Sequence, residues 1–93
     1  MRRYELMVIF PIEEDQHTAG RERLLGDLAA GGAEIEKTDE LGERELAYEI
    51  KKRKRGKYVL FTLKADPAGI DGLGRAFRLN PGLVKYLFVR IEE

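Results

Sequence analysis

Seven consecutive residues near the middle of the chain carry six positive charges and form the clearest candidate for a binding surface. The run is Lys51-Lys52-Arg53-Lys54-Arg55-Gly56-Lys57. Lys and Arg side chains neutralise phosphates, and each neutralised phosphate releases condensed counterions from a nucleic acid. The run therefore predicts contact with an RNA or DNA backbone, without indicating any base sequence. The alternative interpretation is a turn that charge merely keeps hydrated.

An acidic segment lies directly before this basic run. Its carboxylates belong to Glu34, Glu36, Asp39, Glu40, Glu43 and Glu45. Lys plus Arg and Asp plus Glu each number 17, so the formal net charge is zero. Because fields decay over about 8–10 Å at physiological salt, local charge density matters more than the total for a polyanionic partner.

Three further arginines are candidates for phosphate contact. Arg2 and Arg3 precede an apolar strand, and Arg90 lies near the end of the last predicted strand. In the fold predicted below, the start of the first strand and the end of the last share one side of the sheet. The alternative role for these arginines is to keep the strand ends hydrated.

Aromatic side chains on the predicted strands could stack on bases, as in RNA-recognition motifs. They are Tyr4, Tyr48, Tyr58, Phe61, Tyr86 and Phe88. That motif requires a basic residue, glycine and then an aromatic residue. Here Lys57 follows Arg55-Gly56, so core packing or burial at a protein interface is the favoured interpretation.

Catalytic and metal-binding patterns are weak. Glu13, Glu14, Asp15 and His17 could bind a divalent ion, but a helix N-terminus also favours acids. There is no cysteine, and no phosphate-binding loop, nucleophile elbow or dinucleotide-binding glycine pattern. The sequence predicts no enzyme, no metal and no cofactor. It also contains no signal-peptide pattern and no apolar stretch of about 18 residues that could span a membrane.

Periodicity and chain-breaking residues predict the elements that position these groups. The predicted elements are a strand over 3–10, a helix from Asp15 or Thr18 to Ala30, a strand over 33–50, a strand over 58–65, a helix capped by Asp66-Pro67 and stopped by Asn80-Pro81-Gly82, and a strand over 84–91. In the second strand the apolar phase changes between Leu41 and Leu46, which predicts a bulge or bend at Gly42. The basic run is expected to form the next turn.

The resulting order is β-α-β-β-α-β, an α+β class. It predicts a ferredoxin-like split βαβ domain over residues 1–93, with four antiparallel strands and both helices on one face of the sheet. The other face of the sheet is left available to a partner.

Three segments together resemble one known family over essentially the whole chain. They are residues 1–5 before an apolar strand, residues 42–51 with Leu46-Ala47-Tyr48 at their centre followed by Gly56-Lys57-Tyr58, and residues 77–80 before the last strand. The chain resembles the sixth protein of the bacterial small ribosomal subunit, the S-six family.

This resemblance implies a structural role in the ribosome. Family members form a heterodimer with the eighteenth small-subunit protein and bind the central domain of small-subunit ribosomal RNA. Arg2, Arg3, Lys51 and Arg78 lie in the matching segments and carry over as RNA contacts, whereas Lys52 to Arg55 are assigned by charge. The sequence departs from the family at Glu45, often basic there, and ends at Glu92 and Glu93 where many members have a long tail.

Two other functions remain as alternatives. One is a stand-alone single-strand RNA-binding module of the RNA-recognition type. The other is a small-molecule sensor that binds its ligand at a homodimer interface.

Overall fold

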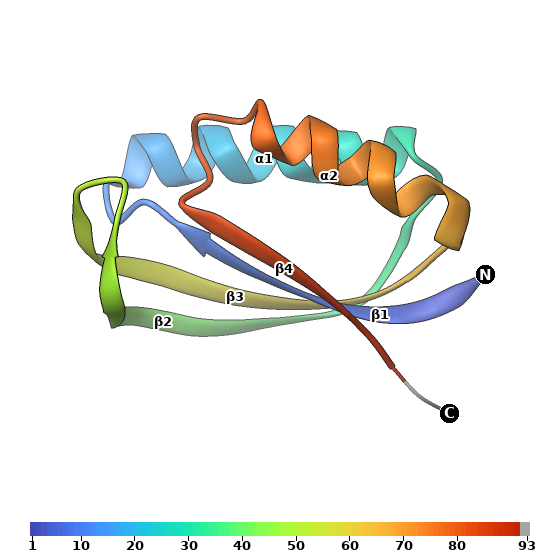
Figure 1. Ribbon diagram of the computed structural model, residues 1–93, viewed down its shortest axis with the longest axis horizontal. Coiled ribbons are helices and arrows are strands. Elements are labelled where there is room, and N and C mark those ends of the chain that lie inside the picture. Colours follow the sequence, from blue (N-terminus) through green and yellow to red (C-terminus); the bar gives the residue numbers. More distant parts are fainter. Residues whose placement is uncertain (92–93) are drawn as a thin grey trace.

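The computed structural model describes residues 1–91, so Glu92 and Glu93 lie outside the described residues. Its elements are β1 (Arg2–Phe10), α1 (Glu14–Ala30), β2 (Glu34–Ile50), β3 (Arg53–Ala65), a short 3-10 turn (Pro67–Gly69), α2 (Ile70–Arg78) and β4 (Lys85–Arg90). The antiparallel sheet has the order β2-β3-β1-β4. Both helices cover one face of it (Figure 1). The predicted α+β, ferredoxin-like fold is confirmed.

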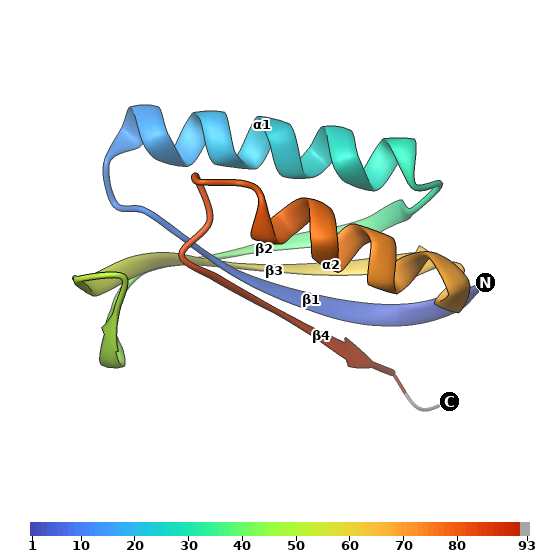
Figure 2. The same ribbon diagram turned by 45° about the horizontal axis from the view of Figure 1, so that its top comes forward.

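The core lies between the sheet and the two helices. Alternate residues of β1 point toward the helices, and Leu6, Val8 and Phe10 are fully buried. Phe61 of β3 packs beside them. The helices contribute Phe77 and three buried leucines, which are Leu24, Leu28 and Leu73. The two helices lie side by side over these residues (Figure 2). The apolar residues that alternate along β1 therefore identify the face of the sheet that the helices cover.

The phase change predicted in the second strand is present at Gly42. The pairing of β2 with β3 shifts register between Glu40 and Gly42, so Leu41 is an extra residue. Gly42 has a φ of 85°, a left-handed conformation that favours glycine. The predicted irregularity is therefore a β-bulge at the predicted glycine.

A larger irregularity follows over residues 46–49. Glu45 pairs with Arg55 and Ile50 pairs with Arg53, which leaves the four intervening residues without partners in β3. The side chain of Leu46 is buried and packs with Ile9 and Val84 in a second, smaller core. Ile9 points away from the helices, so this bulge covers part of the otherwise open sheet face.

The hairpin that joins β2 and β3 is tighter than predicted. Only Lys51 and Lys52 form the turn, with φ values of 50° and 62°. Two left-handed residues in a two-residue hairpin are the signature of a type I′ turn. The prediction that the whole basic run forms the turn is wrong for residues 53–57. These residues extend β3 because their backbones continue the ladder with β2.

The second helix begins as its sequence predicts. The carboxylate of Asp66 accepts a hydrogen bond of 3.0 Å from the backbone N–H of Ala68, and Pro67 follows the cap. A 3-10 turn comes first and α2 then runs to Arg78. Within residues 1–91, no helix is long and apolar enough to cross a membrane.

Candidate nucleic-acid and protein interface

The protein's own carboxylates pair with part of the basic run. Nη1 of Arg53 donates to both carboxylate oxygens of Glu13 at 2.9 and 2.8 Å. Nε of Arg55 donates to Glu43 at 2.7 Å. The Arg53 hydrogen bond holds the pKa of Glu13 below its ordinary value. These two arginines are therefore partly neutralised, and they offer less charge to a phosphate than the sequence suggests.

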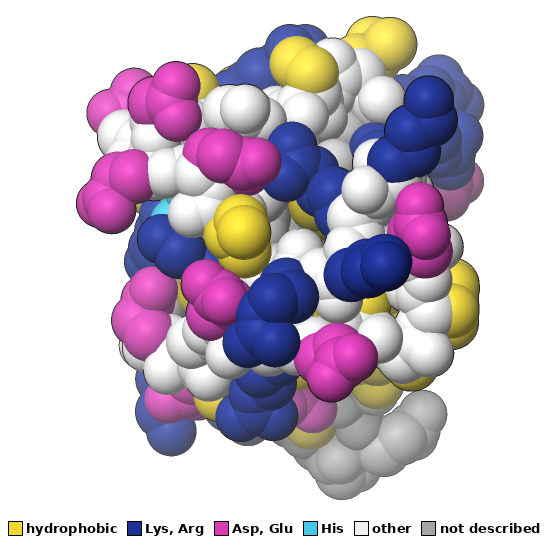
Figure 3. Space-filling model, turned by 90° about the vertical axis from the view of Figure 1, so that its left-hand side faces the viewer, with side chains coloured by type: hydrophobic (Ala, Val, Ile, Leu, Met, Phe, Trp, Pro, Cys, Tyr) yellow, Lys and Arg dark blue, Asp and Glu magenta, His cyan; other side chains and the backbone are white. Residues whose placement is uncertain are grey.

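The lysines of the run have a different environment. Lys52 and Lys54 are exposed and Lys57 is half-buried. None of the three has an ion pair or a side-chain hydrogen bond within the described part of the chain. Figure 3 shows this end of the molecule, where Lys and Arg side chains crowd the surface among Asp and Glu side chains. Within the basic run, the lysines rather than the two arginines supply the uncompensated charge.

The arginines at the strand ends form a separate basic region. Arg90 pairs with Tyr4 in the sheet, and the backbone N–H of Ile91 donates to the carbonyl of Arg3. Arg2, Arg3 and Arg90 therefore share one end of the sheet, as predicted. Arg3 also donates to Glu36 at 2.9 Å. The basic hairpin lies at the opposite end of the sheet (Figure 1), so an RNA would have to follow the length of the molecule to contact both.

Arg78 lies at the hairpin end of the molecule. It lines a pocket of ≈ 250 Å³ together with Lys51 and Lys85. The ammonium of Lys85 donates to the hydroxyl of Tyr48 at 2.9 Å, which raises the pKa of Lys85 above its ordinary value. Sequence reasoning missed Lys85 because it is an isolated cation at the start of a strand.

The acidic segment is also partly neutralised. The guanidinium of Arg21 on α1 donates to both oxygens of Glu40, once at 2.8 Å, and this pairing lowers the pKa of Glu40. Glu36 pairs with Arg3, and Glu43 with Arg55. Glu45, the residue that departs from the family, is exposed on the edge strand. The edge strand thus remains acidic, but its field is weaker than the sequence implies.

An apolar row crosses the sheet face that the helices leave uncovered. Leu60 of β3, Met7 of β1 and Leu87 of β4 are register partners and lie next to one another. Leu87 is 56% exposed, and its neighbour on the same strand face, Val89, is 48% exposed. We call these four residues the apolar row. Exposed side chains of this kind in one place are typical of a protein interface.

The predicted aromatic residues do not form a stacking surface on this face. Tyr4 and Phe61 are buried in the main core, and Tyr86 and Phe88 pack on Phe77 beneath α2. Tyr58 is half-buried in the small second core. Core packing, the favoured interpretation, therefore holds for most of them, and only Tyr48 is widely exposed, at 63%.

The acidic residues near His17 have other structural roles. The carboxylate of Glu13 binds Arg53, and Glu14 and Asp15 lie in the first turn of α1. The ring of His17 packs on Phe10 with 4.7 Å between ring centroids. Among the described residues, no group of three or more His, Cys, Asp or Glu side chains is placed to hold a metal ion.

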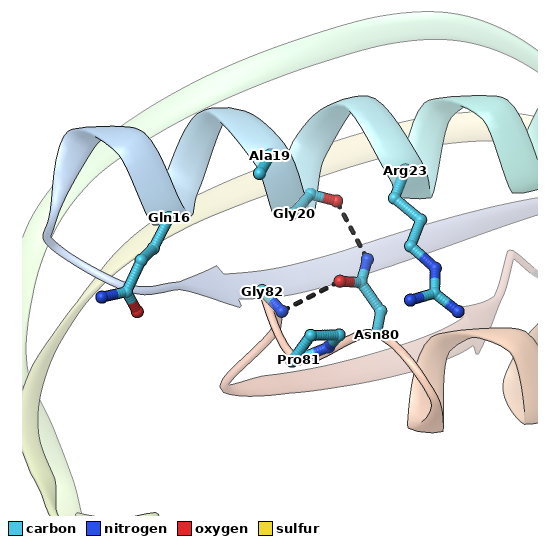
Figure 4. A pocket seen from close by; sticks show the side chains of 7 residues that line it. All are labelled: Gln16, Ala19, Gly20, Arg23, Asn80, Pro81 and Gly82. Carbon is cyan, nitrogen blue, oxygen red and sulfur yellow. Dashed lines mark hydrogen bonds between the residues drawn. The ribbon is translucent and has the colours of Figure 1, made fainter.

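Asn80 locks the loop before β4 onto α1. Its amide donates to the carbonyl of Gly20 at 3.0 Å, and its side-chain oxygen accepts from the N–H of Gly82 at 2.9 Å (Figure 4). Asn80 is 2% exposed and lines a pocket whose rim includes Gln16 and Arg23. Asn80 is the last residue of the segment over 77–80 that contributed to the family resemblance, and its role is structural.

Comparison with known proteins gives a consistent result. The family model described as ribosomal protein S6 matches residues 3–90. The small ribosomal subunit protein bS6 of Treponema denticola is 47% identical over 93 residues and that of Halalkalibacterium halodurans is 42% identical over 95 residues, with 100% of both chains covered in each case.

Solved structures agree on the fold. The 30S ribosomal protein S6 from Thermotoga maritima matches with a TM-score of 0.85 and 27% identity, covering 97% of this chain and 87% of that one. The C-terminal domain of the MgtC protein from Mycobacterium tuberculosis matches with a TM-score of 0.64 at 14% identity, covering 99% of this chain and 89% of that one. The second likeness concerns the fold alone.

Proposed function

Because this chain belongs to the ribosomal protein S6 family of the small ribosomal subunit, we propose that it binds the central domain of small-subunit ribosomal RNA as a heterodimer with the eighteenth protein of that subunit. The family is structural and non-catalytic, so the chain is not an enzyme. The proposed location is the ribosome in the bacterial cytoplasm, and the proposed unit is one domain over residues 1–93.

The uncompensated lysines at the hairpin end are the observation that best supports the proposed RNA binding. Lys52 and Lys54 are exposed at and beside the turn, without a carboxylate partner in the described chain. Such charges are available to phosphate at no cost of breaking an internal ion pair. Arg53 and Arg55 would first have to leave Glu13 and Glu43. Their share in the proposed contact is therefore smaller than that of the lysines.

The apolar row is the surface we assign to the partner protein. It joins three strands through Leu60, Met7 and Leu87, and Leu87 stays 56% exposed within residues 1–91. A stable protein interface buries roughly 1,000 Å² or more in total, so the partner must also cover the polar rim around this row. Glu5 lies next to the row opposite Val89, which favours a partner with basic side chains at its edge.

Cooperation between the two partners follows from the charges. An edge strand rich in carboxylates repels phosphate, whereas the lysines attract it. A protein partner that covers the sheet and adds its own RNA contacts raises the affinity of the pair for RNA. The isolated chain should therefore bind RNA weakly.

RNA titration with and without the partner tests the proposal. The heterodimer should bind a fragment of the central domain more tightly than the chain alone does. Binding no tighter than to an unrelated ribosomal RNA fragment of equal length would refute the proposed function. Equal affinity with and without the partner would remove the cooperative part.

Two double variants test the hairpin. Lys52→Gln with Lys54→Gln should lower the slope of log affinity against log salt by about 0.7–0.9 for each lost phosphate contact. Arg23→Gln with Lys37→Gln removes the same charge from exposed positions that the proposal does not assign to RNA. Lys37 already pairs with Asp39 at 3.7 Å, and this double variant should leave the slope nearly unchanged. Equal slopes for the two double variants would show that the hairpin lysines are hydrated and do not contact RNA.

A separate variant tests the apolar row. Leu87→Gln should weaken the heterodimer about 10-fold or more, because a buried leucine contributes roughly 1.5–3 kcal/mol. The free energy of unfolding of the isolated chain should change little, since Leu87 is already 56% exposed. An unchanged dissociation constant of the heterodimer would show that the partner binds a surface other than the apolar row.

The stand-alone RNA-recognition module finds less support. That module stacks bases on aromatic residues at the centre of its open sheet face. Here the corresponding positions of β1 are Arg3, Glu5, Met7 and Ile9, and Tyr58 of β3 is partly covered by the β2 bulge.

A further inference from the structure

The pocket at the end of α2 brings together three cations from three distant parts of the chain. Lys51 comes from the β2–β3 turn, Arg78 from the end of α2 and Lys85 from the start of β4. Phe77, Leu83, Val84 and Tyr86 form the rest of the lining. Among residues 1–91, no carboxylate lines it. Elsewhere in the described chain Arg3, Arg21, Arg53 and Arg55 all pair with carboxylates.

Each of these three cations is held by an uncharged group. The ammonium of Lys51 donates to the carbonyl of Leu83 at 3.0 Å. That of Lys85 donates to the hydroxyl of Tyr48 and lies 5.4 Å from the centre of its ring.

Arg78 completes this set through Tyr86. Nε of Arg78 donates to the Tyr86 hydroxyl at 3.4 Å, and that hydroxyl donates to the carbonyl of Gly74. Neutral partners orient a cation without cancelling its charge, so all three remain charged and partly pre-oriented toward the pocket. Pre-orientation reduces the entropy that a ligand must remove on binding.

From this arrangement we propose that the pocket binds one phosphodiester group of the ribosomal RNA backbone, with Lys85 as a contact residue in addition to Lys51 and Arg78. The proposal rests on the proposed RNA-binding function and specifies one of its contacts. The volume of ≈ 250 Å³ is below the roughly 300–1,000 Å³ of pockets that enclose small-molecule ligands. It therefore suits part of a nucleotide rather than a free metabolite. The guanidinium of Arg78 has the planar donor geometry that phosphate accepts.

Tyr48 and Tyr86 act as positioning residues in this proposal. Removal of either hydroxyl leaves the charge unchanged but frees Lys85 or Arg78 from its neutral partner. Tyr48 lies within the segment that carries the family resemblance, and its side chain is 63% exposed. The bond to Lys85 gives this exposed tyrosine a role that core packing does not.

The test uses the heterodimer and a central-domain RNA fragment. Lys85→Gln, Arg78→Gln and Lys51→Asn should each weaken binding about 3–10-fold; asparagine suits the positive φ of position 51. Lys37→Gln removes one charge from the edge strand, where Lys37 pairs with Asp39 at 3.7 Å, and is the control for a cation that already has a carboxylate partner. Tyr48→Phe should weaken RNA binding about 2–3-fold, as expected for an orienting contact, with an unchanged free energy of unfolding.

A double-variant cycle tests whether the cations share one phosphate. Lys85→Gln combined with Arg78→Gln should cost less affinity than the product of the two single losses, because both side chains act on the same ligand. Strictly multiplicative losses would contradict a shared phosphate.

Three results would overturn or redirect the inference. If Lys85→Gln and Arg78→Gln bind RNA like the Lys37→Gln control while the Lys52 and Lys54 double variant loses affinity, the pocket is not a phosphate site and the proposed function stands. If the wild-type heterodimer fails to bind, the proposed function itself is refuted. If the pocket variants weaken heterodimer formation in the absence of RNA, the pocket holds an acidic segment of the partner and the inference is wrong.

Discussion

Gly20 in α1 and Gly82 in the loop before β4 lie backbone against backbone, because a Cβ atom built on either glycine overlaps the main chain of the other. This close approach lets the loop reach α1, and Asn80 then bonds to the carbonyl of Gly20. The loop in turn sets where β4 starts and where the pocket of Lys85 lies. The contact between the two glycines therefore positions a candidate RNA contact.

Replacement of Gly20 by alanine should destabilise the fold. The added methyl group meets backbone atoms of Gly82, which cannot rotate away, so the expected loss is about 1–3 kcal/mol in the free energy of unfolding. Gly26, in the same helix, has open space where its Cβ would lie. Gly26→Ala should stabilise the protein by about 0.5–1 kcal/mol. Urea unfolding of both variants measures the two changes in the free energy of unfolding. Changes of the same sign would contradict the close approach of Gly20 and Gly82.

Asn80→Ala should destabilise the protein by about 2–4 kcal/mol. The substitution leaves the carbonyl of Gly20 and the N–H of Gly82 without their partner in a buried place. Arg23→Ala, on the exposed rim of the same pocket, should change stability by less than about 0.5 kcal/mol. Thermal and chemical unfolding give both values. A small loss for Asn80→Ala would show that water replaces the amide.

The element order followed from the sequence because its signals are local. The period-two pattern of β1, the Asp66-Pro67 cap and the glycine at position 42 each act within a few residues. The bulge over residues 46–49 was not predicted, since Leu46, Tyr48 and Ile50 alternate as in a regular strand. Its cause is tertiary, because Leu46 packs on Ile9 and Val84.

The sequence predicted which charged residues belong to the candidate site but not how they are arranged in space. Arg53 and its partner Glu13 are 40 residues apart in the chain, so the sequence could not show that this arginine is paired. Lys85 joins Lys51 only because β4 pairs with β1 and the hairpin reaches the same end of the sheet. Composition therefore located the basic run but overestimated its available charge.

Acid should weaken the fold through His17. Its Nε2 atom is buried without a hydrogen-bond partner in the described chain. Burial lowers the pKa of His17 from 6.5, assisted by Lys57 and Arg21 and opposed by Glu40 and Glu14. Between the lowered pKa and about 6.5 the unfolded chain binds more protons than the folded one, so the free energy of unfolding decreases as the pH falls below about 6.5.

Unfolding curves between pH 7.5 and 5 test this pH dependence. In His17→Gln the decrease over that range should be shallower than in the wild type, although the loss of packing on Phe10 lowers stability at every pH. Parallel profiles for the two proteins would assign the pH dependence to other groups.

The β2–β3 turn should show opposite effects on stability and binding. Lys51 and Lys52 both hold left-handed backbone conformations, with φ values of 50° and 62°, which disfavour a side chain with a Cβ. Asn-Gly is the preferred pair in a type I′ turn. Lys51→Asn with Lys52→Gly should therefore raise the free energy of unfolding by about 1 kcal/mol. The same change removes two cations and should weaken RNA binding by the heterodimer about 10-fold or more.

The control for this prediction is Lys52→Arg, which keeps both the charge and the Cβ atom and should leave stability and RNA affinity close to wild type. A double variant that is more stable and binds RNA equally well would show that the lysines are not needed at the turn. A double variant that is less stable would show that the Lys51 bond to Leu83 outweighs the strain. The predicted combination, more stable and weaker in binding, indicates that the lysines are retained at this turn for RNA contact at the expense of folding.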